Sequence, residues 1–541
     1  MNRKAKWIAL IVTALTWFLL VGWGRGQSVS AYLEVSGEGD SLAVSISLAT
    51  DDSSEVIHSW SDESGDLWLF LPSWSEGRIL KTEGDSELAA WNGQTLSGGL
   101  AAQLSDGRTL TLLVGSEIPT VYLTLEHDFS YVQSDQEASD SGTILVVDAD
   151  GSLLHSGKLA KISGRGNSSW NEEKKPFNIT LGERAALMED GLVTDSYCLL
   201  SSTDQTFLRN RISREMAKEA GAVSMASVNV DLYVNGRYEG VYELSERVTA
   251  QNLGIYDLEE ETLRLNAAQE EPLQQTSGEI ADDWNESVTG KWWEYDREPE
   301  EFTGGYLLEA DDAIRYESEA SGFILDSGTY IVAKSPENLT AVQYRYISTY
   351  LQNCEDIITA SVELSGSEAL DSCLDVASFV GKYLVEEVSK NIDSSSTSQY
   401  FYKDRDGLLC AGPVWDYDWA YGADREQEGI DYSDPEGLAA NQVTGAFTWW
   451  QLLYYNDAFY EQVTAVYEES VYPWLGELTD SLLASWEEEL SESAVMDYLR
   501  WGRVSSGTAE DAAARYHSEV EEVRDFLRIR TEFLYETWCG A

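Results

Sequence analysis

Residues 412–422 decide the interpretation of this sequence, and they are Gly-Pro-Val-Trp-Asp-Tyr-Asp-Trp-Ala-Tyr-Gly. Two acidic residues, Asp416 and Asp418, alternate here with aromatic residues directly after a predicted strand. Two carboxylates this close repel each other unless a cation lies between or beside them. Ligands that offer only oxygen suit Mg²⁺ or Mn²⁺, so the pattern predicts a divalent-metal site. The structural alternative is a surface Asp pair beside buried Trp side chains.

A second segment, residues 161–181, contains a glycine-rich turn and then two lysines that enter a predicted strand. Such a turn offers backbone N–H groups, hydroxyls and a guanidinium to an anion. A glycine-rich turn followed by a strand lysine is what the phosphates of ATP need. The candidate phosphate ligands are Arg165, Asn167, Ser168, Lys174 and Lys175. Glycine-rich turns before basic residues are common, so this segment does not decide the function by itself.

A lone acidic residue, Asp393, follows Asn391 and Ile392 at the end of a predicted helix. A carboxylate just past a helix end can face a cleft and accept a proton. The alternative is a turn in which Asn and Asp only end the helix. In another helix, residues 208–211 contain two arginines, and an ordinary amphipathic helix with a solvated basic face is the favoured interpretation there.

The periodicity of apolar residues predicts a β-rich start and a mixed remainder. Residues 31–133 are predicted to be β structure, and the polar stretch 134–142 to be a linker or turn. Asn235-Gly236 between two β-rich runs predicts a hairpin. Further strands are predicted at 142–147, 177–181, 198–200, 306–309 and 330–334, and helices at 207–220, 336–361, 375–391 and throughout 446–538. The acidic stretch 258–303 is predicted to be a surface insertion, a solvated loop.

The order of these segments is that of a kinase-type fold. A glycine-rich turn, a strand lysine, a helix, a hairpin, a second helix, a lone Asp and a late Asp motif follow one another. In such folds the late Asp motif holds Mg²⁺, and an earlier Asp orients the acceptor hydroxyl. The usual H-R-D and D-F-G signatures of protein kinases are absent.

Seven strings carry a resemblance to the spore-coat-H (CotH) kinase-like family: residues 164–170, 174–177, 208–210, 231–242, 304–307, 391–393 and 415–422. The resemblance covers roughly residues 140–425. It implies a diverged two-lobed protein-kinase-like domain that uses ATP and Mg²⁺ or Mn²⁺. Some members of this bacterial family phosphorylate Ser-rich coat proteins, and others are secreted proteins without a role in sporulation.

Carried over to this sequence, the resemblance implies that Asp416 holds the metal, with Asp418 beside it. Asp393 is implied as the base or the group that orients the acceptor. Many members carry Asn shortly after this lone Asp, and here the matching position is Ser398 or Gln399. In kinases that Asn helps to bind the second metal, so the departure bears on metal stoichiometry and on activity.

The same resemblance assigns nucleotide contacts to the glycine-rich segment. Lys175, or Lys174, is implied to contact the phosphates, and Glu215 is a candidate partner for that lysine. The residues implied to line the nucleotide are Arg165, Asn167 and Ser168.

The charge of the chain limits its partners. It has 36 basic and 95 acidic residues, a net charge of −59. Such a field repels nucleic-acid phosphates and anionic lipid heads. We therefore expect no nucleic-acid partner, and a basic or Ser-rich protein substrate.

The first 30 residues predict export. Arg3, Lys4 and Lys6 precede an apolar run at residues 7–23, the pattern of a signal peptide or a retained membrane anchor. The expected location is extracellular or on the cell surface, with membrane contact only through this segment. The five cysteines form no C-x-x-C and no Cys/His cluster, which argues against a structural zinc site. In an exported chain, Cys354 and Cys373 could pair.

The sequence thus predicts an α+β protein: an N-terminal β-sandwich-like domain over 31–133, a kinase-like core over 140–425 and a helical region over 426–541. The leading hypothesis is an exported atypical protein kinase that transfers the γ-phosphate of ATP to Ser or Thr. The alternative is a non-catalytic envelope or surface binding protein on a degenerate kinase scaffold. A glycoside hydrolase with paired carboxylates ranks lower, because the basic glycine-rich segment would then have no purpose.

Overall fold

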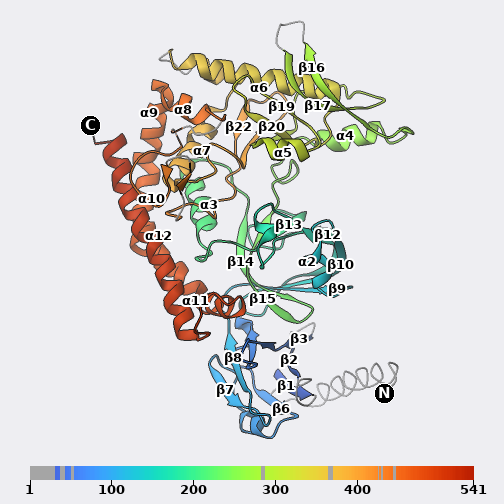
Figure 1. Cartoon of the computed structure of the whole chain (residues 1–541), viewed down its shortest axis with the longest axis vertical. Coiled ribbons are helices and arrows are strands. Elements are labelled where there is room, and N and C mark those ends of the chain that lie inside the picture. The colour runs from blue at the N-terminus through green and yellow to red at the C-terminus, as the bar shows by residue number, and fades with distance from the viewer. Residues whose placement is uncertain are drawn as a thin grey trace. The chain divides into compact units, whose positions relative to one another are not determined.

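The computed structural model is an α+β protein, as the sequence predicts (Figure 1). It describes residues 31–36, 43–49, 54–281, 287–363, 369–423, 426–427, 430–440, 442 and 446–540. The predicted export segment, 1–30, lies outside the described residues. The chain divides into two compact units. The first unit comprises Met1–Glu183, Asn229–Tyr242 and Glu489–Arg515, and the second comprises Arg184–Val228, Glu243–Glu488 and Tyr516–Ala541.

Two four-stranded sheets begin the first unit, with strand orders β3-β2-β1-β6 and β4-β5-β8-β7. Buried and half-buried residues alternate along β8, the period expected of a strand with one face in a core. The predicted β structure of this region is confirmed. The strands are β1 (Ala31–Ser36), β2 (Ala43–Ala49), β3 (Ser54–His58), β4 (Trp60–Ser61), β5 (Leu67–Leu71), β6 (Leu80–Glu83), β7 (Leu100–Gln103) and β8 (Thr109–Val114), with 3₁₀ turns at Ser73–Ser75 and Glu87–Trp91.

Six further strands, wholly or mainly in the first unit, follow in the hydrogen-bonded order β12-β11-β10-β9-β14-β15. Asn235 and Gly236, between β14 and β15, have φ of 49° and 77°. A two-residue type I′ hairpin requires positive φ at both positions, so the predicted hairpin is confirmed. The strands are β9 (Thr120–Leu125), β10 (Ser139–Val147), β11 (Leu153–Gly164), β12 (Phe177–Ala185), β14 (Ser227–Val234) and β15 (Arg237–Glu246).

The stretch predicted to be a linker or turn, residues 134–142, contains a turn at Gln136 and Glu137 between a helix end and a strand. It takes in the end of α2 (Ser130–Ser134) and the start of β10, where Ser139 pairs with Ser163 of β11. The polar residues at the start of β10 form backbone hydrogen bonds in the sheet. The polarity of their side chains does not indicate this pairing.

A seven-stranded antiparallel sheet lies in the second unit, in the order β16-β17-β19-β20-β18-β21-β22. The helix α6 (Ala341–Ser361) packs on β17 (Figure 1). The sheet strands are β16 (Gln274–Ala281), β17 (Ser287–Glu294), β18 (Tyr306–Asp311), β19 (Gly322–Ile324), β20 (Tyr330–Ser335), β21 (Gln399–Lys403) and β22 (Leu409–Ala411). Outside this sheet, β13 (Thr194–Leu200) pairs with the end of β15.

The prediction of a solvated loop at residues 258–303 is wrong. This stretch forms α4 (Leu258–Leu265) and the strands β16 and β17. The acidic composition does not indicate that part of this stretch is buried. Trp292 of β17 packs against Tyr344 of α6 with ring centroids 4.6 Å apart.

The region 446–538 is helical, as predicted. Its elements include two short π-helical segments between α-helices. Among the described residues, no helix is long and apolar enough to cross a membrane. The helices are α8 (Trp449–Tyr454), α9 (Asp457–Val466), the π segment Tyr467–Val471, α10 (Tyr472–Glu477), the π segment Leu478–Leu482, α11 (Leu483–Arg500) and α12 (Ala509–Trp538).

Two helices of the second unit, α3 (Arg209–Ala220) and α7 (Val376–Ser389), pack closely together. They confirm the predicted helices at 207–220 and 375–391. Their approach depends on Gly381, where an added Cβ would lie 2.6 Å from the backbone oxygen of Ala220. No real Cβ sits that close to a backbone atom, so only glycine allows this crossing.

We predict that Gly381→Ala lowers the free energy of unfolding by roughly 1–3 kcal/mol, because the helices must separate. The matched control is Gly476→Ala in α10, where an added Cβ meets nothing within 4 Å. That control should raise stability by about 0.4–1 kcal/mol, since alanine restricts the unfolded chain. Thermal melting of both variants checks this, and equal effects would contradict the close crossing.

A buried carboxyl in the first unit predicts a pH effect. Asp231 on β14 accepts hydrogen bonds from Tyr238 Oη at 2.9 Å and Ser493 Oγ at 2.8 Å. Burial raises the pKa of Asp231 from 3.8 to about 7. The folded state therefore binds more protons than the unfolded state between these values. The stability that Asp231 contributes is present below about pH 4 and is lost as the pH rises through about 7.

We therefore predict that the free energy of unfolding falls more steeply between pH 4 and pH 7 in the wild type than in Asp231→Asn. Denaturant unfolding of both proteins at several pH values measures the two slopes. Parallel slopes would mean that Asp231 does not titrate in this window.

Candidate active site

The loop that carries Asp416 and Asp418 follows β22 in the second unit. Its residues alternate in exposure: Asp416 is exposed, Tyr417 is buried and Asp418 is half-buried. Asp416 has a φ of 69°, in the left-handed region that residues with a Cβ rarely adopt. Strained backbone of this kind persists only where the surroundings over-determine it.

Asp418 is held by hydrogen bonds to both of its carboxylate oxygens. Asn210 Nδ2 donates to Oδ1 at 2.7 Å, and the backbone N–H of Thr203 donates to Oδ2 at 3.1 Å. Burial, together with the negative charges of Asp416, Asp204 and Glu243, raises the pKa of Asp418 to about 7. A cation would relieve this crowding, so the donor set fits a divalent metal.

Asn210, near the start of α3, connects three elements through one amide. Its Oδ1 accepts the backbone N–H of Tyr417 at 2.9 Å. Its Nδ2 donates to Asp418 and also to Glu243 Oε2 at 3.0 Å, where Glu243 lies on β15. The sequence did not single out this contact, because Asn210 and Tyr417 are 207 positions apart.

The prediction of a solvated basic face at residues 208–211 is therefore wrong. Leu208 is fully buried, and Arg209 pairs with Asp204 at 3.2 Å. Asp204 also accepts the backbone N–H groups of Leu208 and Arg209, so the loop before α3 is built around one carboxylate. Arg211 stacks over the Trp486 ring at 4.4 Å.

A fully buried carboxylate, Glu386 on α7, lies under the Asp416–Asp418 loop. It pairs with Lys382 at 2.5 Å and accepts the Tyr417 hydroxyl at 2.8 Å. Its other oxygen accepts Asn391 Nδ2 at 3.0 Å. Both Lys382 and Glu386 have no exposed side-chain surface. One side chain thus connects the Asp416–Asp418 loop with the segment that carries Asp393.

Asp393 is half-buried in the turn that follows α7, and its backbone N–H donates to Asn391 Oδ1 at 3.3 Å. The same turn leads to Ser398, whose hydroxyl donates to Asp416 Oδ2 at 3.4 Å. Gln399, the other residue at the position where the resemblance implies Asn, faces the core and accepts from Trp450 at 3.3 Å. Ser398 is therefore the residue of this pair that reaches the acidic loop.

The glycine-rich segment lies in the first unit. Arg165 is half-buried and Asn167 and Ser168 are exposed in a turn between β11 and β12. Gly166 has a φ of 82°, and its backbone oxygen accepts Gln136 Nε2 at 2.6 Å. Gln136 thus holds the backbone of the turn, and the side chains of Asn167 and Ser168 are exposed.

The two lysines of this segment differ. Lys174 is buried, forms an ion pair with Asp497 and donates to the backbone oxygen of Val241 at 2.5 Å. Burial lowers its pKa to about 8, although Asp497 opposes the shift. Lys175 is half-buried and donates to the backbone oxygen of Trp170 at 2.6 Å, a residue of its own turn.

The partner suggested for the strand lysine, Glu215, is engaged elsewhere. It pairs with Lys218 at 2.7 Å on its own helix and with Arg214 at 3.6 Å. Cys354 and Cys373, which could pair in an exported chain, are both buried free thiols here.

We predict that Glu386→Gln lowers the free energy of unfolding by roughly 3–5 kcal/mol, because the buried Lys382 charge loses its partner. The control is Lys218→Ala, which removes one member of the more exposed Glu215–Lys218 pair. Exposed pairs contribute about 0–1 kcal/mol, so this change should be small. Calorimetric melting of the two variants measures the difference, and losses of equal size would contradict the role given to Glu386.

The chain was also compared with known proteins. A family model described as CotH kinase protein matches residues 162–534. The match begins inside the resemblance at 140–425, extends past its end and takes in most of the C-terminal helices. No curated protein matches the chain. Because the family model matches more than half of the chain, the protein belongs to the CotH kinase family.

Proposed function

We propose that this protein is an exported atypical protein kinase that transfers the γ-phosphate of ATP to Ser or Thr hydroxyls of a protein, with Mg²⁺ or Mn²⁺. The observation that carries the proposal is the crowding of carboxylates at the Asp416–Asp418 loop. Membership of a kinase family supports it. The two-lobed kinase arrangement implied by the resemblance is part of the same proposal.

In this proposal, Asp416 and Asp418 hold the divalent ion. Two protein carboxylates are enough for Mg²⁺, which usually completes its shell with waters and substrate phosphates. The ion would neutralise charge that develops on the phosphate oxygens. Ser398, one of the two residues at the position where the resemblance implies Asn, is hydrogen-bonded to Asp416, and its neutral hydroxyl adds no charge to the site.

Asp393 has the role of proton acceptor in this account. The acceptor hydroxyl oxygen forms a bond to the γ-phosphorus, while the bond from that phosphorus to the β–γ bridging oxygen breaks and ADP leaves with the electron pair. The hydroxyl proton passes to the Asp393 carboxylate. Asn391, two residues before Asp393, anchors this turn by donating a hydrogen bond to the buried carboxylate of Glu386.

The nucleotide contacts proposed for Arg165, Asn167, Ser168 and the lysines stay a prediction. Of the two lysines, Lys175 is favoured for the phosphates, because the Lys174 ammonium is buried against Asp497. The proposed substrate is a Ser-rich or basic protein, since the net charge of −59 attracts basic segments and repels nucleic acid. The proposed location is outside the cell or at its surface, with residues 7–23 as the signal or anchor.

We predict that Mg²⁺-ATP raises the melting temperature of the wild type and not that of Asp416→Asn. A ligand at 100 times its Kd that binds only the folded state stabilises it by roughly 2.7 kcal/mol. Asp393→Asn should keep this shift while phosphate transfer to a Ser-rich basic peptide falls by about 10²–10⁴-fold. Melting curves and transfer of labelled phosphate measure the two effects.

The matched control is Asp525→Asn on α12, an Asp that is 72% exposed and far along the chain from the proposed site. It should leave both binding and transfer unchanged. A wild type that shows no shift with millimolar Mg²⁺-ATP or Mn²⁺-ATP would contradict the kinase proposal, and would favour a non-catalytic binding protein on a degenerate scaffold.

A further inference from the structure

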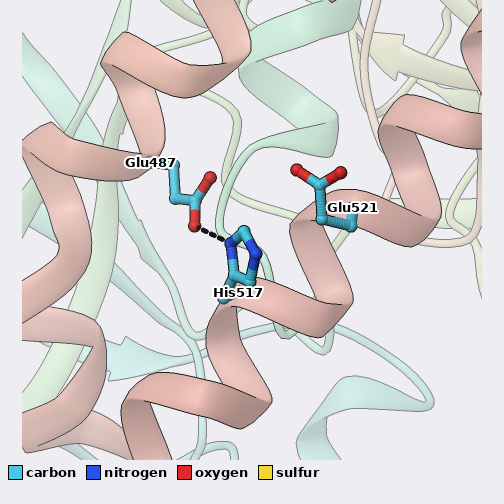
Figure 2. Close-up of side chains that lie close together, drawn as sticks. All are labelled: Glu487, His517 and Glu521. Carbon is cyan, nitrogen blue, oxygen red and sulfur yellow. Dashed lines mark hydrogen bonds and ion pairs between the residues drawn. The ribbon is translucent and has the colours of Figure 1, made fainter.

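A cluster of one imidazole and two carboxylates lies among residues of the second unit (Figure 2). Glu487 lies on α11, and His517 and Glu521 lie one turn apart on α12. Each residue offers one ligand atom, and the three atoms lie within 4.8 Å of one another. Figure 2 shows His517 between the two carboxylates, with its Nδ1 at 2.6 Å from Glu487 Oε1.

The three ligand atoms lie within 4.8 Å of one another and would have to shift by up to about 1.5 Å to reach the spacing that a tetrahedral ion needs. Zn²⁺ binds imidazole nitrogen and carboxylate oxygen at about 2.0–2.2 Å, which places neighbouring ligand atoms about 3.3 Å apart. The distance between Glu487 Oε1 and His517 Nδ1 would have to increase by less than about 1 Å to reach this spacing. His517 is 63% exposed, so its ring has room to move. Three protein ligands would leave the fourth position for water.

The ligand types distinguish between cations. An imidazole nitrogen favours Zn²⁺ and other transition metals, whereas Mg²⁺ and Ca²⁺ prefer sites made only of oxygen. This cluster therefore differs in kind from the carboxylate pair at Asp416 and Asp418. The two sites should be separable by the choice of metal.

A neighbouring cation, Arg524, supplies the competing explanation. Its guanidinium forms an ion pair with Glu521 and lies 3.8 Å from Glu487 Oε2. Glu487 thus turns one oxygen toward His517 and the other toward Arg524. Arg524 Nε and Nη2 are buried without hydrogen-bond partners, so Arg524 relies on these two carboxylates, and a metal ion would have to compete with it for them.

We propose that Glu487, His517 and Glu521 form a binding site for a divalent transition-metal ion of the zinc class, which ties the start of α11 to α12. The site is independent of the proposed kinase chemistry. His517 and Glu521 lie 30 and 34 residues after Glu487 and on a different helix. A metal ion bound to all three would therefore cross-link the two helices.

The test is a Zn²⁺ titration of the full-length, metal-stripped protein by calorimetry, in physiological salt and millimolar Mg²⁺. We expect one saturable site in the wild type and Zn²⁺-dependent thermal stabilisation. His517→Ala and Glu487→Gln should each weaken that binding by about tenfold or more. Titration with Co²⁺ should give the visible absorption of a four-coordinate nitrogen–oxygen site, without the near-ultraviolet band of thiolate ligation.

Two controls make the result specific. His127→Ala removes a histidine of similar exposure, 60%, that faces one carboxylate, Asp140, at 3.1 Å, and it should leave Zn²⁺ binding unchanged. Asp416→Asn should also leave it unchanged, which separates this site from the proposed ATP site. Equal Zn²⁺ binding by wild type and His517→Ala would overturn the proposal. The proposal would also be overturned if the wild type bound no Zn²⁺ and His517→Ala melted at a lower temperature than the wild type without metal. The three residues would then form only an ion-pair network.

Discussion

The buried carboxylate of Glu386 is the constraint on which the acidic centre of this protein depends. A charged group without exposed surface is costly unless it is paired and hydrogen-bonded. Glu386 meets that condition with Lys382, the Tyr417 hydroxyl and the Asn391 amide. These partners come from α7, from the Asp416–Asp418 loop and from the turn before Asp393. None of the three can shift without leaving a buried polar group unsatisfied.

The acidic loop is held from a second direction by α3. Asn210 fixes the backbone at Tyr417 and one oxygen of Asp418 with the same side chain. The approach of α3 to α7 in turn requires Gly381. Two packed helices and two polar contacts therefore explain how Asp416 keeps an unfavourable backbone conformation. Rigid support of this kind is what a site for a metal and phosphate needs.

Local patterns predicted local structure well. Asn235-Gly236 specified its hairpin, because both residues tolerate positive φ. The apolar face of 375–391 specified α7. The family model agrees with the kinase-like resemblance, whereas the divalent-metal site that the Asp-x-Asp pattern predicts stays a prediction. These signals all lie within short windows, where spacing translates directly into geometry.

Long-range contacts could not be predicted in this way. The residues of the helix segment 208–211 do not indicate that Asn210 contacts Tyr417. The acidic composition of 258–303 likewise does not indicate its strands, whose burial depends on contacts with α6. Lys174 and Lys175 are neighbours with the same chemistry, but only the fold shows that one of them is buried against Asp497. The zinc argument from cysteine spacing likewise could not detect a cluster made of His517 and two glutamates.

The central claim is that one buried carboxylate couples the two acidic segments. A double-mutant cycle with Asn391→Ala and Tyr417→Phe, read out as the free energy of unfolding, tests it most directly. The two side chains bind different oxygens of Glu386. The account predicts a coupling energy of at least about 0.5 kcal/mol, because losing one contact already frees Glu386 to move. Losses that add to within about 0.3 kcal/mol would contradict it, since they would make the two segments independent.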